Sequence, residues 1–354
     1  MIIYSKNSGS TDAAYGRIDT PIKMLIEHES DLMKTKGGVC EWLFNVENSN
    51  HFGESIFNQS GFDIFTKVSE GDPAVNDTIR ETGYKFIEHL QFMKEFTITA
   101  EMMEDAQFGI AQDAKRRVQN FVRSYYNTIN KACSQALANG TQNEMSFAGA
   151  YIDTTTFDAM PLFSSNHIYG VEELKQSNYF WGDIAKTGAS DSRSYSIEKI
   201  EESLYTLAGA LRSIKDEKGE PLGYVADTVI LPCNKPTLEH MVKKVCGSEN
   251  IVASANNDIN IHYGNWNVII LPTWVAENDE IMVMSSEANK ALAGNMFFNR
   301  VPLTVSNWID HHTGNYNWTG RCRFGIGFGS YKHIVRAIDA VEGSEPDNCT
   351  YLYE

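Results

Sequence analysis

The stretch GIAQDAKRRVQNFVRSYYNTINKACSQALANG, residues 109–140, contains no proline and carries apolar side chains at the spacing of an α-helix. Its apolar positions, three or four residues apart, are Ile110, Ala114, Val118, Phe121, Tyr125, Ile129, Ala132 and Ala136. Such steps place one apolar stripe along one side of a helix, and the closing pair Asn139–Gly140 suits a C-cap with left-handed φ. A helix of about 29 residues would be about 43 Å long, whereas an average globular helix has only ~11–12 residues. We therefore predict either a strut for a broad, thin protein or a core helix of an ordinary domain.

Length and composition indicate a folded protein. A chain of 354 residues is long enough for two or three domains. Its 42% hydrophobic and 21% charged residues are typical of a packed protein and exclude a disordered one. No apolar run approaches the roughly 18 residues of a membrane span, and the N-terminus lacks the basic and apolar segments of a secretory signal. We expect a cytosolic protein with no membrane partner.

The cysteines and the net charge exclude some sites and partners. The six cysteines, none in a CxxC pair, are Cys40, Cys133, Cys233, Cys246, Cys322 and Cys349. Their spacing argues against a zinc knuckle or redox motif, and we expect free thiols in a reducing cytosol. The net charge of −16 argues against tight general binding to nucleic acid. It suits the wall of a container for DNA, and equally an acidic enzyme.

The first 98 residues predict an arm followed by a hairpin. Residues 1–55 are polar, with a few isolated apolar anchors, and we expect an irregular arm that lies on a protein surface. The apolar positions that alternate with polar ones are Phe62, Ile64 and Val68, then Tyr84, Phe86, Leu90, Phe92, Phe96 and Ile98. This pattern predicts a long β-hairpin over residues 62–98, with its tip at residues 69–78. Because an isolated two-stranded ribbon is only marginally stable, it must lie on its own domain or on a neighbour, unless it is an internal hairpin of a sheet.

The remainder of the chain alternates helices with short apolar strands. We predict helices at residues 196–214 and 236–246, and strands at residues 228–232, 267–272, 281–284 and 321–340, separated by polar loops such as 307–317. Such an order of elements is typical of layered α/β or α+β domains.

No catalytic constellation is visible in the sequence. The pair His311–His312 beside Asp310 lacks a third ligand at helical spacing, so we read it as a polar loop. The run Gly325–Gly329 has large apolar residues between its glycines and is read as a strand with close backbone contacts. Cys133 lies on the helix stripe and is read as a packed small residue. We therefore predict no catalytic residue, no cofactor, no metal and no enzyme activity, although scattered site residues would escape this reading.

The order of the elements resembles the major capsid protein of tailed bacteriophages, which has the Hong Kong 97 fold. EFTITAEMMED at residues 95–105 resembles that family's segment between hairpin and spine helix, and MPLFSSNH at residues 160–167 is similar to a phrase of Mu-like head proteins. Residues 207–232 resemble their helix, charged Gly-x-Pro-Leu turn and strand, and RCRFG at residues 321–325 is similar to their closing strand. The resemblance covers about residues 60–340, and the order of the phrases carries it.

The resemblance implies an α+β fold with named parts. These are an N-terminal arm at residues 1–55, an extended β-hairpin loop at 56–99, a peripheral domain with the spine helix at 100–195, an axial domain at 196–318, and a return to the peripheral domain with a C-terminal tail at 319–354. No long coiled-coil-like segment precedes the arm, which together with Met1 favours a chain without a cleaved scaffolding domain; a separate scaffold stays open.

The resemblance also implies a function and partners. The chain would be a Mu-like major head subunit that self-assembles, as pentamers and hexamers, into the icosahedral head shell around double-stranded phage DNA. It would enclose DNA without sequence-specific binding, with scaffold, portal or decoration proteins as further partners. Its location would be the virion head, after assembly in the cytoplasm of the bacterial host. Inter-subunit contacts are expected on the hairpin, at Phe62, Ile64, Lys67, Asp72, Pro73, Tyr84 and Phe86.

Two alternatives remain. An encapsulin-like shell of the same fold would hold an enzyme in place of DNA, and an acidic soluble enzyme would have scattered site residues. Covalent cross-linking of subunits would need a desolvated lysine nucleophile. Lys67 and Lys85 lie on the predicted hairpin, but nothing identifies a partner, so no cross-link is expected.

Overall fold

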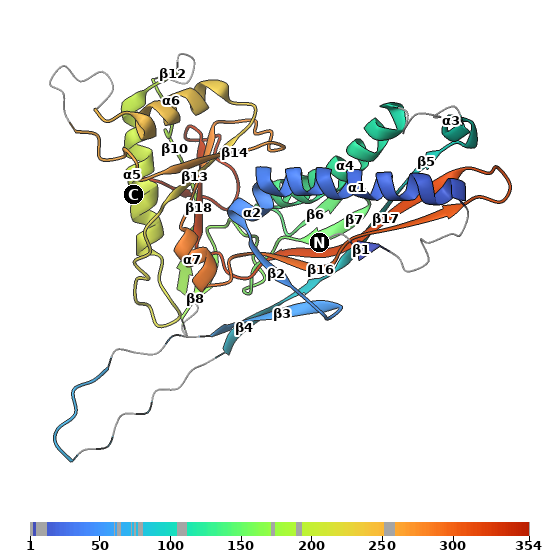
Figure 1. Cartoon of the computed structure of the whole chain (residues 1–354). Helices are drawn as coiled ribbons and strands as arrows, with labels where there is room; N and C mark the ends of the chain where they lie inside the picture. The colour runs from blue at the N-terminus through green and yellow to red at the C-terminus, as the bar shows by residue number, and fades with distance from the viewer. Residues whose placement is uncertain are drawn as a thin grey trace. The chain divides into compact units, whose positions relative to one another are not determined.

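The computed structural model (Figure 1) describes residues 3–4, 13–59, 61, 65–71, 73, 76, 81–104, 112–170, 174–188, 193–250 and 259–353. The chain folds into two compact units, each built from three segments. Unit 1 comprises residues 1–54, 87–133 and 297–326, and unit 2 comprises residues 55–86, 134–296 and 327–354. None of the described helices is both long enough and apolar enough to cross a membrane.

Unit 1 contains a sheet in the order β1-β16-β17-β5, and β2 also pairs with β16. The strands are β1 (Ile3–Tyr4), β2 (Asn45–Asn48), β5 (Leu90–Ile98), β16 (Asn295–Ile309) and β17 (Tyr316–Phe328). β5 runs antiparallel to β17, with Ile98 opposite Tyr316 and Leu90 opposite Phe324. Alternate residues of β17, among them Trp318 and Phe324, are buried, because side chains two residues apart share a face of a strand.

Two long helices complete the core of unit 1. They are α1 (Ala13–Lys36) and α4 (Gln112–Ala138). Unit 1 also contains two short helices, α2 (Val39–Leu43) and α3 (Ala100–Glu104). The buried side chains that these helices share with the sheet are Ile22, Ile26, Ile98, Val118, Phe121, Val122, Leu303, Val305 and Trp318. Gly320 lets the helix approach, since a Cβ at this position would lie 2.3 Å from Phe121 Cζ. The predicted long amphipathic helix is confirmed as the 27-residue α4, about 40 Å long.

The prediction of an irregular arm at residues 1–55 is wrong where the chain forms α1, a helix of 24 residues. Ile22 and Ile26 are fully buried, and the Ser30 hydroxyl lies 2.7 Å from the hydroxyl of Tyr126 on α4. The apolar residues of this segment are few, and most helical stability in proteins comes from packing of an apolar face on neighbouring elements. The helix therefore depends on a partner that is distant in the sequence.

Unit 2 contains a six-stranded sheet in the order β14-β13-β15-β18-β10-β19. Its strands are β10 (Tyr179–Gly182), β13 (Thr228–Pro232), β14 (Asn267–Leu271), β15 (Glu280–Met284), β18 (Ile334–Asp339) and β19 (Thr350–Tyr351). β13 runs parallel to β14 and antiparallel to β15, and β18 runs antiparallel to β15 and parallel to β10. Every residue of β13, β15 and β18 is buried, which explains the continuous apolar runs within β13 and β15.

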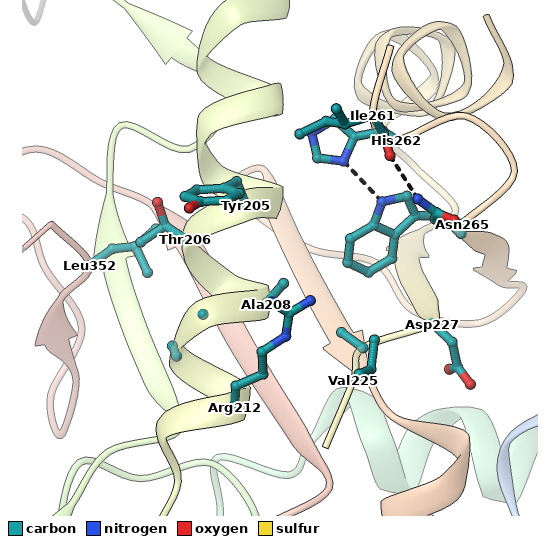
Figure 2. Close-up of a pocket in the computed structure, with 14 residues that line it drawn as sticks. Tyr205, Thr206, Ala208, Arg212, Val225, Asp227, Ile261, His262, Asn265 and Leu352 are labelled. Atoms are coloured by element: carbon teal, nitrogen blue, oxygen red, sulfur yellow. Dashed lines mark hydrogen bonds between the residues drawn. The ribbon is translucent and has the colours of Figure 1, made fainter. Parts of the chain in front are cut away.

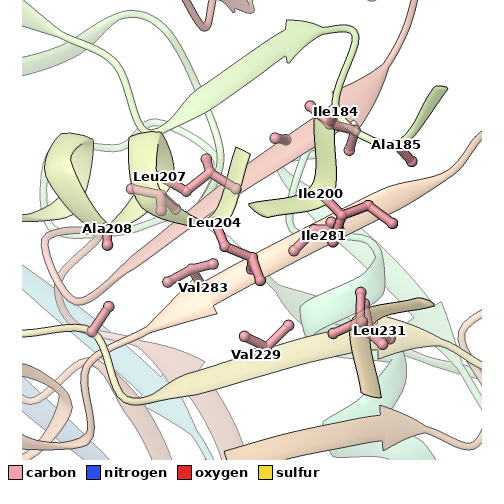
Figure 3. Close-up of a cluster of buried hydrophobic side chains, with 14 of the residues drawn as sticks. Ile184, Ala185, Ile200, Leu204, Leu207, Ala208, Val229, Leu231, Ile281 and Val283 are labelled. Carbon is pink, nitrogen blue, oxygen red and sulfur yellow. The ribbon is translucent and has the colours of Figure 1, made fainter. Parts of the chain in front are cut away.

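Helices α5 (Ile197–Ser213) and α6 (Pro236–Gly247) pack on this sheet, and α7 (Ser286–Ala291) follows β15. Figure 3 shows the core between α5 and the strands, with Leu204 and Leu207 facing Val229 and Val283. The predicted helices at residues 196–214 and 236–246 and the three short apolar strands before residue 290 are confirmed. In each of these elements, the apolar residues that predict it are largely the ones that are buried in the core.

Two predictions about the C-terminal third are corrected. The single strand predicted at residues 321–340 is two strands, β17 and β18, with a turn between them. The polar loop predicted at residues 307–317 is shorter than predicted, because β16 and β17 extend into it from either side and leave a turn at residues 310–315. The long strand β16 itself was not predicted, since its mixture of polar and apolar residues shows no clean alternation.

The β-hairpin is displaced from its predicted position. β3 (Gly53–Gln59) and β4 (Glu81–Glu88) pair as a two-stranded sheet, which we call the hairpin stem. Residues 65–68, within the predicted first strand, form no strand, and Phe62 and Ile64 lie outside the described residues. The second predicted strand is divided, because β5 joins the sheet of unit 1. Alternation identifies a strand-like pattern, but pairing depends on residues that the local pattern does not contain.

Three further two-stranded sheets belong to unit 2. They are β6 (Glu144–Phe147) with β7 (Ala150–Asp153), β8 (His167–Tyr169) with β9 (Leu174–Gln176), and β11 (Lys186–Thr187) with β12 (Ser194–Tyr195).

Candidate functional site

Buried polar contacts attach the hairpin stem to the rest of unit 2. Lys85 of β4 is only 5% exposed; its Nζ lies 2.5 Å from Asp153 Oδ2 and donates a hydrogen bond of 2.6 Å to Thr155 Oγ1. The backbone also approaches closely, since a Cβ on Gly83 would lie 2.8 Å from the carbonyl oxygen of Phe157. The stem is therefore held at a defined position within its unit.

Burial and the contact between Lys85 and Asp153 shift the pKa values of both groups. Burial lowers the pKa of Lys85, although the hydrogen bond and the charge of Asp153 act to raise it. Burial would raise the pKa of Asp153, but hydrogen bonds from Lys85 and Thr155 outweigh burial, so that this pKa lies below its usual value. A carboxylate whose folded pKa is depressed stabilises the fold above its unfolded pKa and loses that contribution in acid.

A second buried contact comes from the other strand of the stem. Asn58 of β3 donates from Nδ2 to Glu217 Oε1 at 3.0 Å, and Glu217 also forms an ion pair with buried Lys332. The Lys332 ammonium lies 5.5 Å from the centroid of the Phe157 ring. Both strands of the stem are thus tied to the same unit through ionised partners.

The outward face of the stem is aromatic. Tyr84 is 68% exposed and Phe86 is 42% exposed, whereas Lys85 between them is buried. Phe57 of β3 is 58% exposed, and Phe65 in the connection between the strands is completely exposed. This arrangement inverts the usual one, in which a strand turns its apolar residues inward and its lysines outward. Exposed apolar groups gathered on one element mark a surface that a partner covers.

The predicted contact residues are placed as follows. Tyr84 and Phe86 lie on the stem, and Lys67 and Pro73 are exposed in the connection between the strands. Phe62, Ile64 and Asp72 lie outside the described residues. The sequence analysis did not single out Phe57 and Phe65. The polar residues around Phe57 in GESIFNQ could have indicated that this side chain lies on an exposed strand. Whether these side chains contact another subunit stays a prediction.

Unit 2 also has an open groove of about 760 Å³ beside α5, which we call the α5 groove. Figure 2 shows Tyr205 and Arg212 of α5 on one side, with Ile261 and His262 on the other. Tyr205, Ile261 and Val225 are 67%, 66% and 56% exposed, so the groove has an apolar rim.

The polar groups of the α5 groove have structural partners. Trp266 donates from Nε1 to His262 Nδ1 at 3.0 Å, and burial lowers the pKa of His262, so this imidazole is neutral at pH 7. Asp227 accepts hydrogen bonds from the Ser286 amide and hydroxyl, at 3.1 and 3.0 Å. A nucleophile activated by a base needs the two groups within hydrogen-bond reach, and the described residues that line the groove show no such pair.

The motifs that the sequence singled out have ordinary structural roles. His311 and His312 lie in the turn between β16 and β17, where Asp310 accepts hydrogen bonds from the His312 amide and the Thr313 hydroxyl. Asp310 therefore stabilises the turn. Among the described residues, no cluster of three histidine, cysteine or acidic side chains could hold a metal ion.

The close backbone contact predicted for the glycine run is confirmed at Gly325, where a Cβ would lie 2.9 Å from the carbonyl oxygen of Glu88. Cys133 is fully buried, as predicted for a packed small residue, and burial raises the pKa of its thiol. A protonated, inaccessible thiol is a poor nucleophile.

Comparison with known proteins identifies the fold. No protein-family model and no curated protein sequence matches the chain. Solved capsid structures do match: those of the cyanophage P-SCSP1u and of Ralstonia phage GP4 each have a TM-score of 0.51 and 10% identity, covering 86% of this chain and 88% of theirs. The capsid of Myoviridae phage XM1 has a TM-score of 0.51 and 10% identity over 86% of this chain and 92% of that one.

The chain therefore has the α+β fold of these phage capsid structures, and the predicted Hong Kong 97-type fold is confirmed. At 10% identity the likeness concerns the path of the chain, because few side chains are shared. Conclusions about function have to come from the surfaces of this chain.

Proposed function

We propose that this chain is a major capsid subunit, which self-assembles into the icosahedral head shell that encloses double-stranded phage DNA. The observation that carries the proposal is the likeness to capsid structures over 86% of the chain. The exposed aromatic residues on the hairpin stem add to it, because exposed apolar groups gathered on one element are typical of an interaction surface.

The proposed mechanism is geometric. One chain must make several nearly equivalent contacts, and closed symmetry converts many modest interfaces into a stable shell. The hairpin stem and the connection between its strands would form the extended loop, with Tyr84, Phe86, Lys67 and Pro73 covered by a neighbouring subunit. The buried contacts of Lys85 with Asp153 and Thr155 would hold this loop at a defined position on its own subunit. No substrate is turned over in this role.

The remaining parts take their roles from the same proposal. Residues 1–55 would form the N-terminal arm, residues 100–195 and 319–354 the peripheral domain with the spine helix α4, and residues 196–318 the axial domain. Most residues that line the α5 groove would belong to this axial domain. Its apolar rim would contact another copy of the chain where subunits meet in pentamers and hexamers. A portal, scaffold or decoration protein would join the shell in the virion head, which would assemble in the bacterial cytoplasm.

Electron microscopy of the purified full-length chain tests the proposal, with light scattering for mass and nuclease protection for content. We expect closed shells that protect DNA when they are formed during infection. Shells that hold a protein cargo and no DNA would indicate the encapsulin-like alternative. A stable monomer near 40 kDa at high protein concentration would refute self-assembly and favour the soluble enzyme.

A further inference from the structure

The negative charge of the chain is concentrated in one unit. Unit 1 has 14 Lys and Arg against 15 Asp and Glu, a net charge of −1, whereas unit 2 has 16 against 31, a net charge of −15. Together these account for the −16 of the chain. A protein that repels polyanions on average therefore has one unit that is nearly neutral, and the arrangement of charges within that unit decides what it attracts.

Within unit 1, helix α4 is strongly basic. Its 27 residues contain five basic side chains and a single acidic one, Asp113 near the N-terminus. An exposed stripe with steps of four, three, four and four residues consists of Arg116, Asn120, Arg123, Asn127 and Lys131. These steps place the five side chains on one side of the helix, opposite the buried Val118 and Val122. Acidic side chains are absent from this stripe.

Neighbouring residues widen the stripe. Lys94 of β5 donates from Nζ to Ser124 Oγ at 2.9 Å, which places a further ammonium beside the helix. Arg117 donates from Nη1 to the Thr97 carbonyl oxygen at 2.8 Å, and Lys115 is exposed next to it. We define the α4 basic face as Lys94, Lys115, Arg116, Arg117, Arg123 and Lys131.

Helix α1 lies alongside α4 (Figure 1), and one acidic side chain of α1 contacts this face. Glu29 Oε1 lies 2.5 Å from Arg123 Nε, and Gln119 also donates to Glu29, at 3.4 Å. The Glu29 side chain is 4% exposed, whereas that of Arg123 is 53% exposed. The carboxylate therefore lies beneath the guanidinium and fixes its position, while the outer surface stays cationic. Lys94 and Arg117 instead donate to uncharged groups, the Ser124 hydroxyl and the Thr97 carbonyl oxygen.

We propose that the α4 basic face contacts the backbone phosphates of duplex DNA, and that it is the surface which the subunit turns toward the enclosed genome. This rests on the proposed capsid function and deepens it. Residues 115–131 span about 24 Å along the helix, over which duplex DNA presents roughly 14 phosphate charges. Carboxylates further away than about 8–10 Å from this face are screened at physiological salt, so a local basic surface attracts phosphates even in a chain of negative net charge. Such contacts are independent of DNA sequence.

The test measures the salt dependence of DNA binding by the unassembled full-length chain, using fluorescence anisotropy with a labelled duplex of about 30 base pairs. The variant K115Q/R116Q/K131Q removes three charges and leaves Arg123 on Glu29. Because each neutralised phosphate contributes about 0.9 to the slope of log K against log salt, we expect the slope to decrease in magnitude by up to about 2.7. The matched control K175Q/K244Q/K290Q removes three exposed charges from unit 2, and its slope should equal that of the wild type.

Two results would overturn the inference. One is an equal slope in the α4 variant and the wild type. The other is binding of polyglutamate at least as tight as binding of DNA, which would assign the face to an acidic polypeptide. Circular dichroism serves as the control that both variants are folded. Electron microscopy of the same preparations separates the two proposals: shells without the slope difference refute this inference alone, and the slope difference in a chain that never forms shells supports the DNA-binding face and refutes the capsid role.

Discussion

Tyr84 offers the sharpest test of the hairpin stem, because its side chain is 68% exposed on a strand whose buried face holds Lys85. We expect Tyr84→Ala to leave the folded subunit nearly unchanged and to weaken assembly. An aromatic side chain buries roughly 200 Å², so a neighbour that covers the exposed part of Tyr84 removes about 140 Å² from water. At about 25 cal/mol per Å², this contributes up to about 3.5 kcal/mol per contact.

The effect on assembly follows from that figure. Since each 1.4 kcal/mol is a factor of ten, loss of about 3.5 kcal/mol weakens a subunit contact by up to about 300-fold. The protein concentration at which shells first appear, measured by light scattering and checked by electron microscopy, should rise accordingly. Surface substitutions generally change the free energy of unfolding by less than about 0.5 kcal/mol. Since about a third of Tyr84 is buried in the subunit, its loss lowers the free energy of unfolding by about 1–2 kcal/mol more. The thermal midpoint should therefore fall only slightly.

Tyr151 supplies the matched control. It is 71% exposed, and it also lies on a strand of a two-stranded sheet in unit 2, so Tyr151→Ala removes a similar exposed ring. We expect the assembly threshold of Tyr151→Ala to match that of the wild type. An unchanged threshold for Tyr84→Ala, or an equal shift for both variants, would refute the reasoning that the hairpin stem is the covered surface.

Three further predictions concern other parts of the chain. Deletion of residues 69–78 should leave a folded subunit and weaken shells; normal shell yield and stability would contradict a cross-subunit role for this connection. Burial lowers the pKa of His333 to about 3, so the folded state excludes a proton that the unfolded state binds below about pH 6.5, and stability should fall as the pH decreases from 6.5 toward 3. Urea unfolding at pH 7 and 4.5 should show a smaller acid loss for His333→Gln, and an equal loss would exclude this group as a cause. Gly320→Ala should lower the thermal midpoint, because its Cβ would overlap Phe121 at a cost of about 1–3 kcal/mol, whereas Gly209→Ala in open space on α5 should raise it; equal midpoints would count against the close helix–sheet contact.

The helices of this chain were predictable where the information is local. The stripe of α4 and that of α5 repeat at 3.6 residues, and the buried strands β13 and β15 are short apolar runs between polar turns. In each case the residues that specify the element lie within the element. The order of such elements was also sufficient to indicate the fold of phage capsids.

Pairing and docking were not predictable in the same way. α1 depends on contacts with α4 that join residues about a hundred positions apart, such as Ser30 with Tyr126. β4 pairs with β3, which precedes residues 62–68, the segment that the alternating pattern predicts as its partner. An alternating strand can pair with any other strand that has a compatible face, so the local sequence does not specify which strand becomes its partner.

For the candidate surfaces, the sequence by itself determined the composition: aromatic residues alternating with polar ones near residue 85, and a helix with five basic residues in an acidic chain. Only the tertiary structure decided which face is available. On β4, alternation shows that Tyr84 and Phe86 share a face, and the contact of Lys85 with Asp153 makes the aromatic face the outer one. On α4, Phe121 occupies the space above Gly320 and turns Arg116 and Lys131 outward. Periodicity defines the faces of an element, and burial against distant residues determines which of them remains exposed for a partner.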